Sequence, residues 1–112
     1  MLAKNFRLSK QSDFKLVFSK GQKNFGKVFI IRFLSNLEEN SRVSVIVSNK
    51  ISKKATVRNK LKRQTREIVK IILPKLKQNY DIIITLMSPC LNLDYQQLES
   101  ELVCSFKKAR LI

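Results

Sequence analysis

Residues 50–66, KISKKATVRNKLKRQTR, restrict the possible folds of this chain more than any other stretch. They hold eight cations in seventeen positions and no acidic residue. Placed on a helix at about 100° per residue, residues 54–73 gather mainly apolar side chains on one side, which we expect to face the core. These side chains are Val57, Leu61, Thr65, Ile68 and Ile72. A long helix of this kind needs a surface to cover, and Pro74 ends it by removing an N–H and clashing with the preceding turn.

Strand-like runs lie on both sides of this helix and can supply that surface. In residues 42–48, RVSVIVS, valines alternate with other residues, which is typical of a strand. Residues 81–86, DIIITL, form a nearly continuous apolar run of strand length. The segment from Val43 through the basic helix to Ile84 therefore predicts a βαβ unit.

The remaining elements complete a mixed pattern. Residues 12–21 space Phe14, Val17 and Phe18 as a short helix does, and 27–34 read as a strand that we expect to pair with 42–48 as a hairpin. A final helix follows from about residue 93, with Asn92 or Asp94 as its cap. The order helix, strand, strand, helix, strand, helix predicts an α+β fold, a two-layer α/β sandwich formed by one domain over residues 1–112.

The charge balance points to a polyanionic partner. The chain has 23 Lys and Arg against 8 Asp and Glu, a formal charge of +15 that repels itself unless it is neutralised. On the predicted helix, one solvent-facing side collects Arg58, Asn59, Lys62, Arg63, Arg66 and Lys70. A merely solvated face is the alternative, but such faces normally alternate their signs along i, i+4 rows. Nucleic acid is the leading partner.

The titratable residues favour binding over catalysis. The chain has no histidine and its acids are scattered, so a protein general base or a carboxylate cluster for metal ions is hard to assemble. We expect no catalytic residue and no metal site. Cys90 and Cys104 are expected to be reduced thiols, with one disulfide as the alternative. The first residues, MLAKNFRLSKQSDF, hold no apolar run for a signal peptide or membrane span, so a cytoplasmic protein without a membrane partner is expected.

A family resemblance rests on these motifs. The string VRNKLKRQTRE, residues 57–67, resembles the RNR signature of the bacterial ribonuclease P protein subunit. Arg-Leu at 7–8, the pattern D-F-x-x-V-F-x-x-G at 13–21 and YDIIIT at 80–85 are similar to the same family. Asn49, Lys60 and Leu86 depart from the residues usual in that family.

The resemblance implies a protein that works with a catalytic RNA to remove the 5′ leader of precursor tRNA. The RNA would carry the chemistry, and Mg²⁺ would be bound chiefly by RNA phosphates. The implied contacts with the catalytic RNA are Arg58, Asn59, Lys60, Lys62, Arg63 and Arg66. The implied contacts with the leader are Phe14, Phe18, Arg32, Lys50, Lys53 and Lys54. The family also implies a ribosomal-protein-like fold with a left-handed βαβ crossover.

Two aspects of this interpretation have alternatives. Phe14 and Phe18 would line a cleft between the first helix and the sheet, where bases can stack on their rings, although a helical Phe pair is often simply core. Arg32 stands where a further cleft aromatic is often found, and the three lysines would reach phosphates of the leader or of the catalytic RNA. The main alternative to a ribonuclease P subunit is a small basic ribosomal or other structural RNA-binding protein. A DNA-binding helix-turn-helix protein conflicts with the predicted strands, so no DNA partner is expected.

Overall fold

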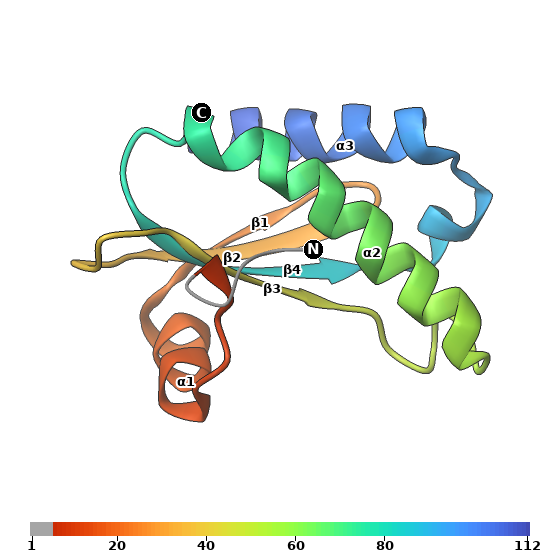
Figure 1. The fold of residues 1–112 in the computed structure, drawn as a ribbon, viewed down its shortest axis with the longest axis horizontal. Coiled ribbons are helices and arrows are strands. Elements are labelled where there is room, and N and C mark those ends of the chain that lie inside the picture. The colour runs from red at the N-terminus through yellow and green to blue at the C-terminus, as the bar shows by residue number, and fades with distance from the viewer. Residues whose placement is uncertain (1–5) are drawn as a thin grey trace.

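A four-stranded sheet carries two helices on one face and one helix on the other (Figure 1). The computed structural model describes residues 6–112. Its elements are α1 (Gln11–Lys20), β1 (Gln22–Phe25), β2 (Phe29–Ser35), β3 (Arg42–Ile46), α2 (Ala55–Ile72), β4 (Tyr80–Leu86) and α3 (Tyr95–Lys108). Two 3₁₀ turns, Leu73–Lys75 and Ser88–Asn92, contain the two prolines.

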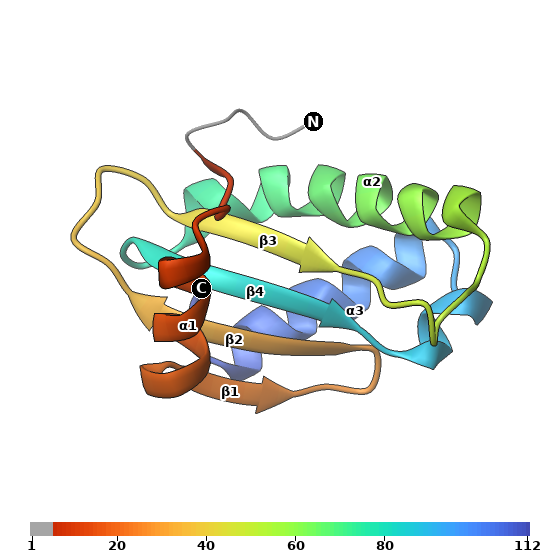
Figure 2. The same ribbon diagram turned by 90° about the horizontal axis from the view of Figure 1, so that it is seen from below.

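The predicted βαβ unit is confirmed. β3 and β4 are parallel neighbours, with Val43 opposite Ile82 and Val45 opposite Ile84. The chain leaves β3, passes across the far face as α2 and returns as β4, as Figure 2 shows, and this crossover is left-handed. Most crossovers of this type are right-handed. The handedness implied by the family resemblance is therefore the one that the chain adopts.

The predicted hairpin between residues 27–34 and 42–48 is wrong. The strand order is β1-β2-β4-β3, so β4 separates β2 from β3, and the antiparallel neighbours of β2 are β1 and β4. Nearly every residue of β4 is buried, which suits a central strand covered on both faces. The actual hairpin partner, β1, is a short, mostly exposed strand of sequence QKNF, and its weak apolar pattern hid it.

The main core lies between the sheet and the pair α2 and α3. On α2, Leu61, Thr65, Ile68 and Ile72 are buried and Val57 is half-buried, as the helical spacing predicted. The final helix begins after Asp94, whose side chain accepts a hydrogen bond from the backbone N–H of Gln97 in a capping box.

The sequence did not indicate where the first helix lies. α1 packs on the face opposite α2 and α3 (Figure 2), where Val17 and Leu8 form a small cluster with Ile83 of β4. Because α1 has only ten residues, it covers one end of that face. The other end keeps several half-buried or exposed side chains, which we call the open face. Its residues are Lys23, Phe25, Ile30, Arg32 and Thr85.

Candidate nucleic-acid interface

The solvent side of α2 presents cations along most of its length. Asn59, Arg63 and Lys70 are exposed, with Asn59 one turn before Arg63, and Lys62 and Arg66 are half-buried along one edge. Lys60 is exposed at the other edge of this side, about 160° around the helix from Lys62 at about 100° per residue. We call this set, residues 59, 60, 62, 63, 66 and 70, the cationic side of α2. Arginine forks and mobile lysine charges on a rigid helix suit a phosphate backbone.

Arg58 has an internal partner that the sequence did not indicate. Its Nη1 donates a hydrogen bond to the backbone carbonyl of Ser52 at 2.8 Å, and the side chain is half-buried. Arg58 therefore fixes the loop that leads into α2 as well as adding charge. Its other N–H groups remain available to a phosphate.

The loop before α2 holds the three lysines predicted for phosphate contact. Lys50, Lys53 and Lys54 are all exposed, while Ile51 between them is buried and anchors the loop. The first turn of α2 contains no acidic residue. The partial positive charge of a helix N-terminus therefore adds to the charge of these lysines, which favours an anion at this position.

On the other face, an aromatic ring and a cation of the predicted leader set lie together. Phe18 of α1 is 52% exposed, and the guanidinium carbon of Arg32 on β2 lies 4.9 Å from the centroid of its ring. Phe14, one turn earlier, is half-buried against the cluster of Leu8, Val17 and Ile83. The core interpretation therefore fits Phe14 in part. Phe18 is free to offer its ring to solvent or to a ligand.

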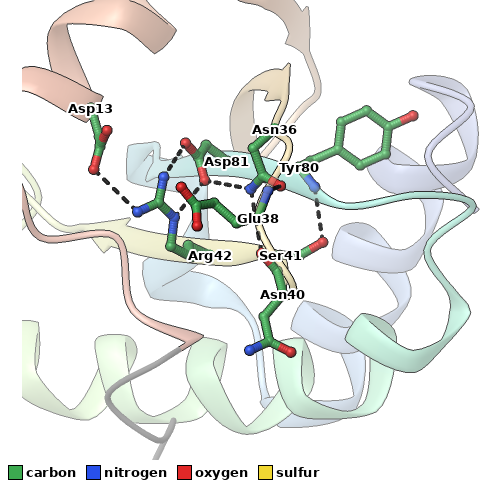
Figure 3. Close-up of polar contacts among 8 residues, drawn as sticks. All are labelled: Asp13, Asn36, Glu38, Asn40, Ser41, Arg42, Tyr80 and Asp81. Carbon is green, nitrogen blue, oxygen red and sulfur yellow. Dashed lines mark hydrogen bonds and ion pairs between the residues drawn. The ribbon is translucent and has the colours of Figure 1, made fainter.

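Sequence reasoning missed a polar network that holds α1 over the sheet. Arg42 of β3 donates from Nε and Nη2 to the two carboxylate oxygens of Asp81, and its Nη1 lies 3.2 Å from Asp13 of α1 (Figure 3). Asn36 donates a further hydrogen bond to Asp81 at 2.7 Å. The hydrogen bond to Asp81 raises the pKa of the Arg42 guanidinium, although burial opposes the shift. These residues are distant in sequence, and no local pattern could have paired them.

The remaining groups offer few routes to protein-based chemistry. Among residues 6–112, no three His, Cys, Asp or Glu residues are grouped so that they could hold a metal ion. Both cysteines are free thiols, as predicted, and burial raises the pKa of the Cys90 thiol. In the same part of the chain, no helix combines the length and the apolar character that crossing a membrane requires.

Comparison with known proteins places these features in a family context. Residues 2–110 match the family model described as Ribonuclease P. The chain is 34% identical to the ribonuclease P protein component of Synechocystis sp., over 99% of this chain and 90% of the relative. It is 31% identical to the corresponding protein of Bacillus cereus, over 96% of this chain and 94% of the relative.

Solved structures agree with the sequence comparison. A Staphylococcus aureus RNase P protein mutant with defective mRNA degradation activity superposes with a TM-score of 0.90 at 27% identity, covering 97% of this chain and 92% of that one. The RNase P protein from Thermotoga maritima gives a TM-score of 0.81 at 29% identity, covering 91% and 96%. The similarity extends over nearly the whole chain in both.

Proposed function

This chain belongs to the ribonuclease P protein family, and from that membership we propose that it binds the catalytic RNA and the single-stranded 5′ leader of precursor tRNA. As a protein component of ribonuclease P it is part of a tRNA-processing ribonucleoprotein with an RNA partner. We propose further that residues 1–112 act as one RNA-binding domain in the cytoplasm.

The cationic side of α2 is the observation that most supports this proposal. The cations Lys62, Arg63 and Arg66 lie with Asn59 on the solvent side of α2, and the adjoining loop adds exposed lysines. Like charges at such spacing repel each other, and an RNA backbone would offset the repulsion. Arg58 would act twice, as a phosphate ligand and as the tie that holds the loop through Ser52.

The leader would bind on the face that carries α1. Phe18 can stack on an unpaired base, Arg32 beside it can neutralise a phosphate, and Phe14 would add its accessible edge. Stacking does not depend on base identity, which suits an enzyme that processes many leaders. Lys50, Lys53 and Lys54 would contact phosphates of the leader where it leaves this face.

The chemistry would belong to the RNA. The acids Asp13 and Asp81 are occupied by Arg42, and we assign no catalytic role to any side chain of the protein. Magnesium ions would be bound mainly by RNA phosphates, and the protein would favour cleavage by holding the leader and the catalytic RNA together.

Reconstitution tests the proposal directly. The protein is mixed with the ribonuclease P RNA of the same genome, and cleavage of a 5′-labelled precursor tRNA is followed at low magnesium with and without protein. We expect the protein to restore cleavage at the mature 5′ end. A protein that binds the RNA but leaves low-magnesium cleavage unchanged would instead support a structural RNA-binding role.

A further inference from the structure

An exposed aromatic ring extends the open face beyond the predicted leader residues. Phe25, the last residue of β1, is 65% exposed, and Nζ of Lys23 lies 4.5 Å from the centroid of its ring. We propose that Lys23 and Phe25 form a second stacking site for a leader nucleotide, next to the site formed by Phe18 and Arg32. This inference rests on the proposed leader binding and adds a subsite to it.

The strand register places the two sites on the same face. Lys23 lies opposite Arg32 and Phe25 lies opposite Ile30 in the antiparallel pair of β1 and β2. Side chains of directly paired residues lie on the same face of a sheet. Asn24 and Ile31 form the intervening pair and point to the other face, where Ile31 belongs to the main core.

The two sites also follow one another across the strands. Phe18 contacts Arg32, Arg32 is paired with Lys23, and Lys23 contacts Phe25. Neighbouring strands are separated by about 4.8 Å, so the cations of the two pairs are adjacent. The result is a continuous surface with a ring at each end and two cations between the rings. Figure 2 shows that β1 lies at the sheet edge, beside β2, and that the end of β1 is not covered by α1.

Single-stranded RNA fits this surface better than a protein partner does. A lone exposed ring is ordinary on a protein surface. Here the ring is paired with a cation, the neighbouring Arg32 adds positive charge, and none of the five residues of the open face is acidic. Bases stack on aromatic rings while cations neutralise the phosphates between them. A ring and a cation repeated on one face match this alternation of base and phosphate.

Arg32 gives the second ring a specific role. On the open face, β2 offers the cation Arg32 and the aliphatic Ile30 but no ring. Phe25 adds an aromatic surface one strand further out, on β1. The leader would therefore have to be longer to reach it.

The test measures how affinity depends on leader length. Reconstituted holoenzyme is titrated with precursor tRNAs whose leaders increase one nucleotide at a time, and with mature tRNA, using wild type, Phe25→Leu and Phe18→Leu. We expect Phe25→Leu to weaken binding by about five-fold, but only beyond a threshold length, because stacking is worth on the order of 1 kcal/mol per base. Phe18→Leu should weaken binding of shorter leaders as well. An abasic nucleotide at the threshold position should remove the difference between wild type and Phe25→Leu.

One control variant and one further variant of the site distinguish loss of the second site from a general loss of affinity. Leu37→Ala removes an exposed apolar side chain in the loop between β2 and β3 and should change nothing at any length. Lys23→Gln should reduce the salt dependence of binding for long leaders only.

Each negative outcome has its own meaning. If Phe25→Leu matches wild type at every length while Phe18→Leu loses affinity, the second site is wrong and the proposed function stands. Equal losses for precursor and mature tRNA would also overturn the second site, because Phe25 would then contact another part of the complex. If wild type itself binds precursor no better than mature tRNA, the proposed leader binding fails.

Discussion

Arg42 donates two hydrogen bonds to the carboxylate of Asp81, from Nε to Oδ1 at 2.9 Å and from Nη2 to Oδ2 at 2.7 Å. The two residues are register partners in the parallel strands β3 and β4, and the third nitrogen of Arg42 reaches Asp13 on α1. One guanidinium thus links the only parallel pair of the described sheet to the helix that carries Phe14 and Phe18. This link helps to hold α1 against the end of the sheet beside the open face.

Asp81→Asn should destabilise the fold much more than Asp13→Asn does. Asp81 is buried, and losing its charge leaves a partly buried guanidinium without its main counter-charge, at a cost on the order of 3 kcal/mol. Asp13 makes a single, more exposed contact at 3.2 Å, so its loss should cost about 1 kcal/mol or less. Urea unfolding of the two variants measures the difference. Equal costs would contradict the role of Asp81 as the main partner.

The Arg42 interactions should show little pH dependence on the basic side of neutrality. The hydrogen bond to Asp81 raises the pKa of Arg42 relative to the unfolded chain. A raised pKa means that the stabilisation is complete below the unfolded value and is lost only as the pH rises through the still higher folded value. The difference in unfolding free energy between wild type and Arg42→Met should therefore be constant from pH 7 to about pH 9. A difference that shrinks over that interval would contradict it.

Arg63→Ala and Arg66→Ala should each weaken assembly with the catalytic RNA and flatten its salt dependence. Each lost phosphate contact lowers the log–log slope by about one unit. Arg58→Ala should weaken assembly too, but it also frees the Ser52 carbonyl, so it is the less direct test. Lys108→Gln, at the exposed end of α3, is the matched control and should leave the slope unchanged. If the slope is unchanged in both arginine variants, the proposal that α2 contacts phosphates of the catalytic RNA is wrong.

Phe18→Leu should lower affinity for precursor tRNA by about 1 kcal/mol and leave mature tRNA unaffected, because the lost interaction is a stacked leader base. Its ring is half exposed, so the melting temperature should stay near that of wild type. Phe14→Leu should lower both precursor affinity and melting temperature, since Phe14 also packs against Val17 and Ile83. Binding and thermal unfolding of both variants check the contrast. If the Phe18 variant loses stability but no precursor affinity, the ring acts in packing and does not stack on the leader.

Gly21→Ala should destabilise the protein. A Cβ at this position would lie 2.4 Å from the carbonyl oxygen of Val17 and 2.8 Å from that of Phe33, both of them backbone atoms that cannot rotate away. The forced shift of α1 against β2 should cost about 1–3 kcal/mol. Gly26→Ala is a useful comparison, because its closest contact is the Ser105 hydroxyl at 2.7 Å. Removing that hydroxyl with Ser105→Ala should relieve part of the Gly26→Ala cost, whereas it should not help Gly21→Ala.

Local pattern in the sequence was enough to identify the helices and the three longer strands. The 3.6-residue spacing on α2 predicted which side of it is buried, and the apolar run of β4 predicted a covered strand, because both signals come from residues close together in the chain. The motif in residues 57–67 indicated the family, and the comparisons confirmed it. The candidate RNA-binding cations were also readable in this way, since exposed charge on a helix follows from its periodicity.

Tertiary structure alone decided how these elements meet. The place of β4 between β2 and β3, the short strand β1 and the opposite face taken by α1 depend on long-range burial, which no local window contains. The same is true of the bond from Arg58 to Ser52, of the pairing of Arg42 with Asp81, and of the row from Phe18 to Phe25 across three elements. A side chain's partner across a fold is set by which surfaces exclude water together, and that is a property of the whole packed chain.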